Sequence, residues 1–355
     1  MSITRLALLL LPALASCRCS PTRLARRVAL EVVERTQPDE ATTATTPAPA
    51  PAPGGDPPAP VIADIPARLA PDAGAALGGC AIYPPDNPWN RDISGDPVDP
   101  LSDRYIANIQ AHGDPNLHPD FGANPEYGIP YVVVPATQPR VPIRFTEYGD
   151  ESDPGPYPIP PDAPVEFGRD HHVLVLQQGT CTLYELYHAS REGAGWAAGS
   201  GAVFNLRSNA LRPREWTSCD QAGLPILPGL VRYDEVVLGE IRHALRVTFE
   251  HTQAAWIAPA THPGGDDHDR EAPPMGLRLR LKASFNTARL RGMSRVIARA
   301  MQRYGMFVAD TGGNWYVSGN TDRRWSDDDL EQLKAIPGTA FEVVRSGPLQ
   351  RRATR

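Results

Sequence analysis

Two carboxylates and an imidazole are spaced in this chain so that they could do acid–base chemistry between neighbouring strands. Asp170 and His172 stand just before one apolar run, and Glu185 lies inside the next one. If the chain turns back tightly between the runs, His172 faces Glu185, and Asp170 is a diagonal neighbour of Glu185 at roughly 7–8 Å. Two carboxyl groups at such a separation can flank a bond that is to be hydrolysed. The pattern therefore predicts a hydrolytic site, and the simpler interpretation is a His–Glu pair at the rim of a sheet.

Two strands and a turn must position these groups. Val173–Leu176 and Thr182–Tyr187 are rich in β-branched, aliphatic and aromatic residues, which favour strands. Gln177–Thr180 includes a glycine and is typical of a turn, so we expect a tight return that pairs its first residue with its last. Because side chains alternate along a strand, one face would then carry Asp170, His172, Leu174, Cys181, Leu183, Glu185 and Tyr187. A slip of one residue would destroy this arrangement.

The expected roles follow from the neighbours of each group. Glu185 would be the general acid, because apolar neighbours raise the pKa of a carboxyl group. Asp170 or Asp150 would be the second carboxylate, and His172 would orient Glu185. Three aromatic side chains would be platforms for sugar rings: Tyr187, Trp196 and Trp315.

A second candidate element lies near the C-terminus. Met306–Ala309 is predicted to be a strand that delivers Asp310 into a turn, and Trp315 opens the return strand. An acidic residue at a strand end beside aromatic residues suits a sugar-binding site. The alternative is that Asp310 is simply a turn residue.

Two sets of residues in the sequence could bind a metal ion. Asp150, Glu151 and Asp153 lie in a proline-rich loop, where three carboxylates could bind Ca²⁺ or supply a second acid, although a solvated loop is the alternative. A metal-dependent hydrolase would have to gather four side chains: His172, Glu185, His188 and His243. Strand alternation places the first and third of these on opposite faces, which counts against the idea. The cysteine and histidine spacing indicates no structural zinc site.

The N-terminus carries a targeting pattern. Arg5 precedes the apolar run Leu6–Leu14, which is too short to be a permanent membrane span. The following Leu14-Ala15-Ser16-Cys17 resembles the lipobox of bacterial lipoproteins, in which Cys17 would become the lipidated first residue. An ordinary secretory signal is the alternative. We therefore expect an exported protein that is lipid-anchored to the cell envelope, at the outer membrane if the cell is Gram-negative.

Composition sets the organisation of the remaining chain. Of 355 residues, 39 are proline, and many of these lie in a Pro/Ala-rich tract. We expect a signal peptide over residues 1–16, a lipidated stalk over 17–79, one globular domain over 80–345 and a tail over 346–355. Short apolar runs between Pro and Gly predict a mainly β fold, a β-sandwich or jelly-roll-like body with a few short helices. The net charge of −6 gives no electrostatic case for nucleic acid as a partner.

Within this domain, the run Leu277–Ala283 alternates strictly. We expect its leucines to face the core, while Arg278, Arg280 and Lys282 face outward. Among the cysteines of the domain, we expect Cys80 and Cys181 to form a disulfide in an oxidising compartment. Cys219 would remain free and buried.

From Cys80 to about Val344 the chain resembles a family of secreted bacterial proteins whose activity is not established. The segments that carry the resemblance include CAIYPPDNPWN, YGDESDPGPYPIP, SGAVFNLRSNALRP, PPMGLRLRLKASF and YGMFVADTGGNWYVSG. The resemblance implies export and assigns no catalytic residue.

These observations lead to three hypotheses about function. The first is a surface-anchored, carbohydrate-active protein that hydrolyses an envelope or environmental polysaccharide with paired carboxylates and no cofactor. The second is a polysaccharide-binding or structural surface protein without catalysis. The third is the metal-dependent hydrolase described above. The expected partners are an extracellular polymer and, through the lipid anchor, a membrane.

Overall fold

The computed structural model describes residues 74–352. The predicted signal peptide, the lipidated Cys17 and nearly all of the predicted stalk lie outside these residues. The first described strand, β1 (Ala76–Leu77), pairs with β2 (Cys80–Ala81), so the described strands include residues before Cys80. Among residues 74–352, no helix has the length and apolar character that a membrane span requires.

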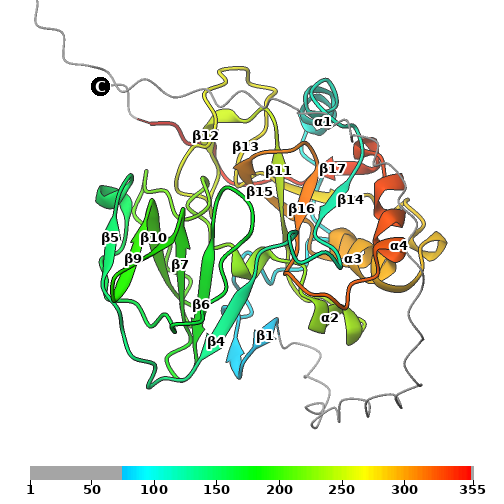
Figure 1. Ribbon diagram of the computed structural model, residues 1–355. Coiled ribbons are helices and arrows are strands. Elements are labelled where there is room, and N and C mark those ends of the chain that lie inside the picture. Colours follow the sequence, from blue (N-terminus) through cyan, green and yellow to red (C-terminus); the bar gives the residue numbers. More distant parts are fainter. Residues whose placement is uncertain (1–73, 353–355) are drawn as a thin grey trace, which may run out of the picture. The chain divides into compact units, whose positions relative to one another are not determined.

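The described chain is mainly β, as predicted, with 17 strands in five sheets and a few short helices. The four-stranded sheet has the order β10-β7-β6-β4, and only the β4–β6 pair is parallel. Its strands are β4 (Tyr131–Val134), β6 (Val173–Gln177), β7 (Thr182–Tyr187) and β10 (Ser200–Asn205). This sheet holds the hairpin that the sequence predicts (Figure 1).

The six-stranded sheet has the order β17-β14-β15-β11-β16-β3 and mixes parallel with antiparallel pairs. Its strands are β3 (His118–Asp120), β11 (Leu245–Phe249), β14 (Arg278–Leu281), β15 (Met306–Thr311), β16 (Tyr316–Ser318) and β17 (Phe341–Val343). The pairs β11–β15 and β16–β3 are parallel. Because β3 and β17 both belong to this sheet, strands from early and late parts of the described chain meet in it.

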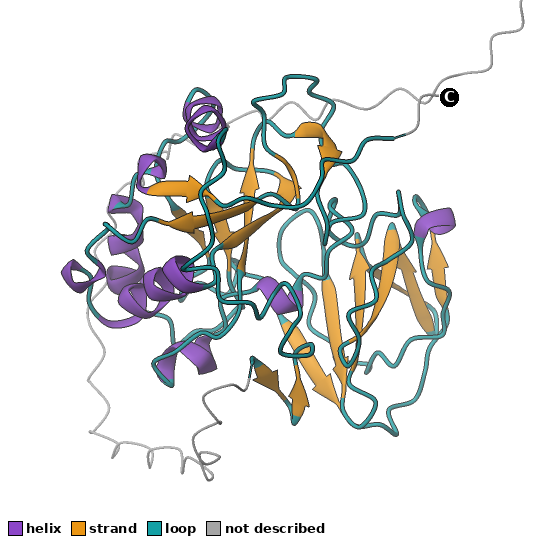
Figure 2. Cartoon of the chain, turned by 180° about the vertical axis from the view of Figure 1, so that it is seen from behind, coloured by secondary structure: helices purple, strands orange, loops and turns teal. Residues whose placement is uncertain are grey.

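Smaller elements complete the fold. A three-stranded sheet contains β5 (Ile143–Phe145), β8 (Ser190–Glu192) and β9 (Gly195–Ala198), and a further pair is β12 (Gln253–Trp256) with β13 (Pro274–Met275). The α-helices are α1 (Ser102–Gln110), α2 (Tyr233–Val237), α3 (Gly292–Arg303) and α4 (Asp327–Leu330). The 3₁₀ turns are η1 (Gly149–Glu151), η2 (Leu227–Gly229), η3 (Thr287–Arg289), η4 (Glu331–Ala335) and η5 (Gly338–Ala340). Most helical segments lie beside the six-stranded sheet (Figure 2).

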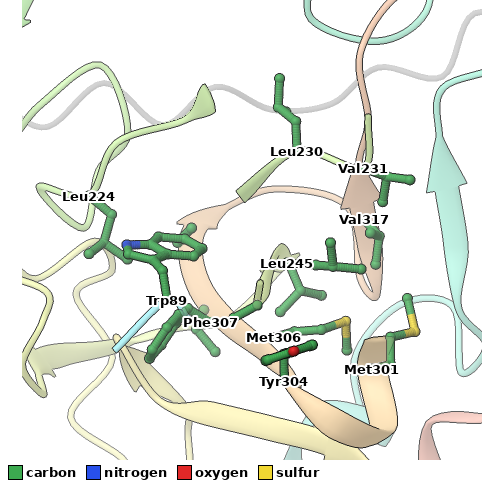
Figure 3. Close-up of a cluster of buried hydrophobic side chains, with 14 of the residues drawn as sticks. Trp89, Leu224, Leu230, Val231, Leu245, Met301, Tyr304, Met306, Phe307 and Val317 are labelled. Carbon is green, nitrogen blue, oxygen red and sulfur yellow. The ribbon is translucent and has the colours of Figure 1, made fainter. Parts of the chain in front are cut away.

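The core explains why the strands of the central hairpin are apolar on both faces. Leu174, Leu176 and Leu183 belong to the main cluster, which also takes in the six-stranded sheet and α3. Figure 3 shows part of this cluster, with Trp89 against Phe307 and Met301 pointing inward. The alternate side chains of the hairpin belong to a second cluster with Trp196 of β9. The four-stranded and three-stranded sheets therefore pack on each other through an apolar layer.

The register of the hairpin differs by two residues from the predicted one. Leu174 pairs with Glu185 and Leu176 with Leu183, so residues 178–181 form a four-residue loop instead of a two-residue turn. Cys181 adopts φ +52° in this loop and is bonded to Cys80, so it belongs to the loop and not to the strand. A shift of two residues preserves the faces, and Leu174, Leu183 and Glu185 still share one.

The cysteine prediction is confirmed. Cys80 and Cys181 form a disulfide with a Cα–Cα distance of 5.5 Å, across a sequence separation of 101 residues. Cys219 is the free cysteine of the described residues, and it is buried. The bond ties β2 to the loop of the central hairpin.

Candidate functional site

Glu185 lies in the middle of β7 and is completely buried. The backbone amides of Ile226 and Leu227 donate to its carboxylate at 3.0 Å, so the side chain anchors the chain at the start of η2. Burial raises the pKa of Glu185 to about 7, although the hydrogen bonds from the two amides act to lower it. A raised pKa is what the apolar neighbours in the sequence predicted. The expected role as an acid facing a substrate does not fit, because the carboxyl group has no exposed surface.

His172 is also buried, and its partner is not Glu185. Its Nδ1 lies 2.6 Å from Glu166 Oε2, and its Nε2 lies 3.0 Å from the carbonyl oxygen of Cys219. Both partners are acceptors, so the protonated ring satisfies both. Burial would lower the pKa of His172, but Glu166 raises it to about 9. The prediction that His172 orients Glu185 is therefore wrong: strand pairing sets Leu174 opposite Glu185, and Glu166 holds the imidazole.

A buried ion pair lies at the centre of the polar residues. Arg246 of β11 donates from Nη2 to Asp220 Oδ1 at 2.8 Å and from Nε to Oδ2 at 3.2 Å. Its Nη1 donates to Ser318 Oγ at 2.5 Å, and Nη2 lies 4.0 Å from Asp310 Oδ2. Arg246 and Asp220 are 5% and 1% exposed, so the pair is shielded from water. The charge of Arg246 is therefore fixed and weakly screened, and it acts on three neighbouring carboxyl groups, those of Asp120, Glu166 and Asp310.

Asp310 lies near the end of β15 and is partly exposed. Burial of its carboxyl group raises its pKa well above the ordinary value, and the charge of Asp220 and a side-chain hydrogen bond with Asp220 add to the shift. Arg246 acts in the opposite direction but is already engaged by Asp220. Asp310 thus holds its proton more tightly than an ordinary aspartic acid, with part of its side chain open to solvent.

Strand pairing brings a third carboxyl group to the same place. Asp120 of β3 pairs with Ser318 of β16, and Ser318 contacts Arg246. Burial raises the pKa of Asp120, and the nearby Glu166 adds to the shift. For Glu166 itself, burial favours a higher pKa, but the charge and hydrogen bonds of His172 lower it below the ordinary value. The pKa values of these neighbouring carboxyl groups are therefore shifted in opposite directions.

We call the set of these polar residues the Arg246 cluster. It consists of Asp120, Glu166, His172, Asp220, Arg246, Asp310 and Ser318. Asp120, Glu166 and Asp310 are partly exposed, whereas the other four are buried. Carboxyl groups whose pKa values are shifted in opposite directions around a buried cation are candidates for giving and taking protons.

Two further predicted residues lie at the edge of this cluster. The ring of Tyr187 is 5.8 Å from that of His172, and burial with the charges of Asp170, Glu147 and Asp310 raises the pKa of Tyr187 to about 12. Asp170 is exposed, and its carbonyl oxygen accepts from the amide of His188 at 2.6 Å. The structure thus brings together four predicted residues, Asp170, His172, Tyr187 and Asp310, although in different roles.

The two predicted tryptophan platforms are in the core. Trp315 is 0% exposed and packs between Phe249 and Phe341, and its indole N–H donates to Gln110. Trp196 is 3% exposed and belongs to the apolar layer between the sheets. Neither ring offers a face to a ligand, so the expected role as a sugar platform is wrong for both.

The acidic loop before the hairpin is fastened to the fold by its own carboxylates. Asp153 accepts from the Val203 amide at 2.9 Å and from Arg212, and Glu151 accepts from the Thr217 amide at 2.9 Å. Asp150 is exposed at η1 and lies outside the Arg246 cluster.

The residues of the metal-dependent hypothesis are held apart by separate partners. His188 contacts Glu147 at 2.7 Å, and His243 contacts Glu235 at 2.9 Å. Over residues 74–352, no group of three or more His, Cys, Asp or Glu side chains is placed to hold a metal ion. The Ca²⁺ site expected at Asp150–Asp153 thus has no such group in the structure.

Sequence reasoning missed Glu166, Asp220 and Arg246. A usable signal existed for Arg246, because a charge inside the apolar strand Leu245–Phe249 requires a buried partner. Nothing in the sequence indicated that the partner would be Asp220. Comparisons with known protein families, curated proteins and solved structures find no match for this chain.

Proposed function

We propose that this protein hydrolyses glycosidic bonds of an extracellular polysaccharide, with Asp310 as the general acid. The observation that carries the proposal is the state of Asp310: a partly exposed carboxyl group whose pKa is raised by burial and by Asp220. A general acid must keep its proton at working pH and still reach the leaving oxygen. Arg246 supports this state, because its ion pair with Asp220 fixes that carboxylate beside the acid.

Glu166 is the second carboxylate of the proposed mechanism. His172 lowers the pKa of Glu166, whereas burial and Asp220 raise the pKa of Asp310. Acid-assisted hydrolysis of a glycoside needs one protonated and one ionised carboxyl group, and these opposite shifts favour that pairing. In this role Glu166 would activate water or stabilise positive charge that develops on the sugar ring.

A polysaccharide is favoured as the substrate by the surroundings of Asp310. The half-buried Tyr187 presents a ring and a hydroxyl group at the edge of the Arg246 cluster. His118 and Tyr316 stack at 4.1 Å and are partly exposed, on strands β3 and β16 that also carry Asp120 and Ser318. Aromatic faces beside carboxyl groups suit sugar rings, which are apolar on their faces and polar at their edges. The disulfide agrees with an extracellular setting.

The test is product release from a panel of polysaccharides by the purified chain and two variants. Asp310→Asn keeps the shape of the side chain but removes the proton donor, and we expect it to lower the rate by about 10²–10⁴-fold. Asp266→Asn, in an exposed loop, is the matched control and should retain full activity. Equal release by wild type and Asp310→Asn would reject Asp310 as the acid.

A non-catalytic binding protein is the second candidate. It is favoured by the hydrogen bonds of Arg246, whose side chain donates to Asp220 and Ser318 within the protein. In that case the only role of Arg246 would be to join the strands. This candidate predicts that no polymer in the panel releases product, while one of them retains both the wild type and Asp310→Asn on an affinity column.

A further inference from the structure

A row of four arginines runs along the outer face of α3. Arg291 is the N-cap residue, and Arg295, Arg299 and Arg303 follow at intervals of four residues, all exposed. Side chains four residues apart are neighbours on a helix surface, with Cβ atoms about 5–6 Å apart. The row therefore forms one continuous positive edge.

The opposite face of α3 accounts for its stability. Ile297 and Met301 are completely buried there, and Figure 3 shows Met301 pointing into the core cluster beside Met306 and Tyr304. Like charges four residues apart weaken a helix slightly. The arginine row thus contributes nothing that the packing of α3 requires.

The row is only partly neutralised by the protein itself. Arg303, at its C-terminal end, pairs with Asp92 at 2.8 Å and with Glu240 at 3.2 Å. Arg291, Arg295 and Arg299 form no ion pair with any carboxylate of residues 74–352. Three guanidinium groups in single file are thus available to an external anion.

We propose that Arg291, Arg295 and Arg299 bind a linear, carboxylate-bearing polysaccharide. A guanidinium group donates two parallel hydrogen bonds to a carboxylate, and a chain of uronic-acid units presents carboxylates in a line. A broad anionic surface fits less well, because the three guanidinium groups follow one another in a single line along α3. An interfacial helix also needs a free apolar face, and that of α3 is buried in the core.

This inference is independent of the proposed hydrolysis, because it requires binding alone. Binding of the purified chain to polygalacturonate is measured at low salt, with neutral dextran and phosphatidylglycerol vesicles as comparisons. We expect binding to polygalacturonate only, and weaker binding as salt screens the contacts. Arg295→Gln/Arg299→Gln should bind about fivefold more weakly, whereas the charge-matched Arg270→Gln/Arg345→Gln should bind as wild type does.

Equal binding of polygalacturonate by the two double variants would overturn the proposal. It would also be overturned if the chain bound vesicles through Arg295 and Arg299 and did not bind the polymer. Melting temperatures check the fold, and both double variants should match the wild type because all four side chains are exposed. If the α3 variant does melt earlier, the two single variants give the same test at about twofold each. Asp310→Asn should bind polygalacturonate normally, so a failure of hydrolysis and a failure of binding can be told apart.

Discussion

Arg246 grips both carboxylate oxygens of Asp220, with Nη2–Oδ1 at 2.8 Å and Nε–Oδ2 at 3.2 Å, in a region closed to water. The pair joins β11 to the loop that carries the free Cys219, and its Asp220 carboxylate adds to the effect of burial in raising the pKa of Asp310. A buried pair of this kind contributes little net energy over an apolar replacement, but loss of one partner leaves an uncompensated charge. The pair therefore adds little to the stability of the fold, but removal of one charge alone is costly.

The first prediction concerns that interdependence. Arg246→Gln should destabilise the fold by about 3–5 kcal/mol, because Asp220 would remain buried without its cation. Urea unfolding at pH 7 measures the change. Arg144→Gln is the control, since Arg144 pairs with Glu192 on the exposed surface and its removal should cost less than about 1 kcal/mol. Similar losses for the two variants would mean that water reaches the Arg246 cluster.

The course of the chain near the hairpin shows what local sequence can and cannot predict. Strand residues, the disulfide and the free Cys219 follow from local composition and from the count of cysteines. The register does not, because Cys181 lies in the loop with φ +52° and is bonded to Cys80, 101 residues away, and the local sequence shows neither feature. A hairpin read in isolation lacks that constraint.

The strand Arg278–Leu281 fails the sequence prediction for a related reason. Its alternation predicted outward arginines, yet Arg278 and Arg280 are 3% and 8% exposed. Arg278 donates to the carbonyl oxygens of Pro88 and Arg91, and Arg280 to that of Ile93, so a segment almost 190 residues earlier covers this face. Alternation distinguishes the two faces of a strand, but it does not tell whether distant chain covers the second face.

The candidate site was only partly predictable. Asp310 is predictable because it lies near the end of a strand beside aromatic residues, and Tyr187 because alternation places it on the same face as His172. Asp220 and Arg246 come from a loop and a strand that the six-stranded sheet brings together, and Glu166 reaches His172 from the segment before the hairpin. Pairing between such distant residues is decided by topology, which local patterns do not encode.

The second prediction concerns His172 at alkaline pH. Its pKa in the folded protein is about 9, against an ordinary value of 6.5, because Glu166 favours the charged ring. The folded state therefore holds a proton that the unfolded state releases above pH 6.5, and this stability is lost as pH rises through 9. Between pH 6.5 and 9 the wild type should lose on the order of 3 kcal/mol more than His172→Gln does.

Urea unfolding of both proteins at several pH values over that range measures the difference. The comparison cancels the titration of groups that the two proteins share. Parallel curves for wild type and His172→Gln would show that the Glu166–His172 pair does not hold the extra proton.

The third prediction concerns Glu185 in the acidic-to-neutral range. Burial raises its pKa to about 7 from an ordinary 4.5, so the folded state prefers the protonated form. Stability from this group is fully present below pH 4.5 and is lost as pH rises through 7, on the order of 3 kcal/mol in all. Glu185→Gln stays neutral, and its side-chain oxygen can still accept from the amides of Ile226 and Leu227.

We therefore expect Glu185→Gln to be no more stable than the wild type at pH 4.5, and to become steadily more stable than the wild type as the pH rises to 7.5. Thermal unfolding over this range gives the comparison, with Glu126→Gln, an exposed residue, as the control whose difference from wild type should not change with pH. A constant gap between wild type and Glu185→Gln would mean that the carboxyl group is ionised throughout, held by the two amides and by the charge of His172. In that case the main role of Glu185 would be to anchor the start of η2 as a permanent anion.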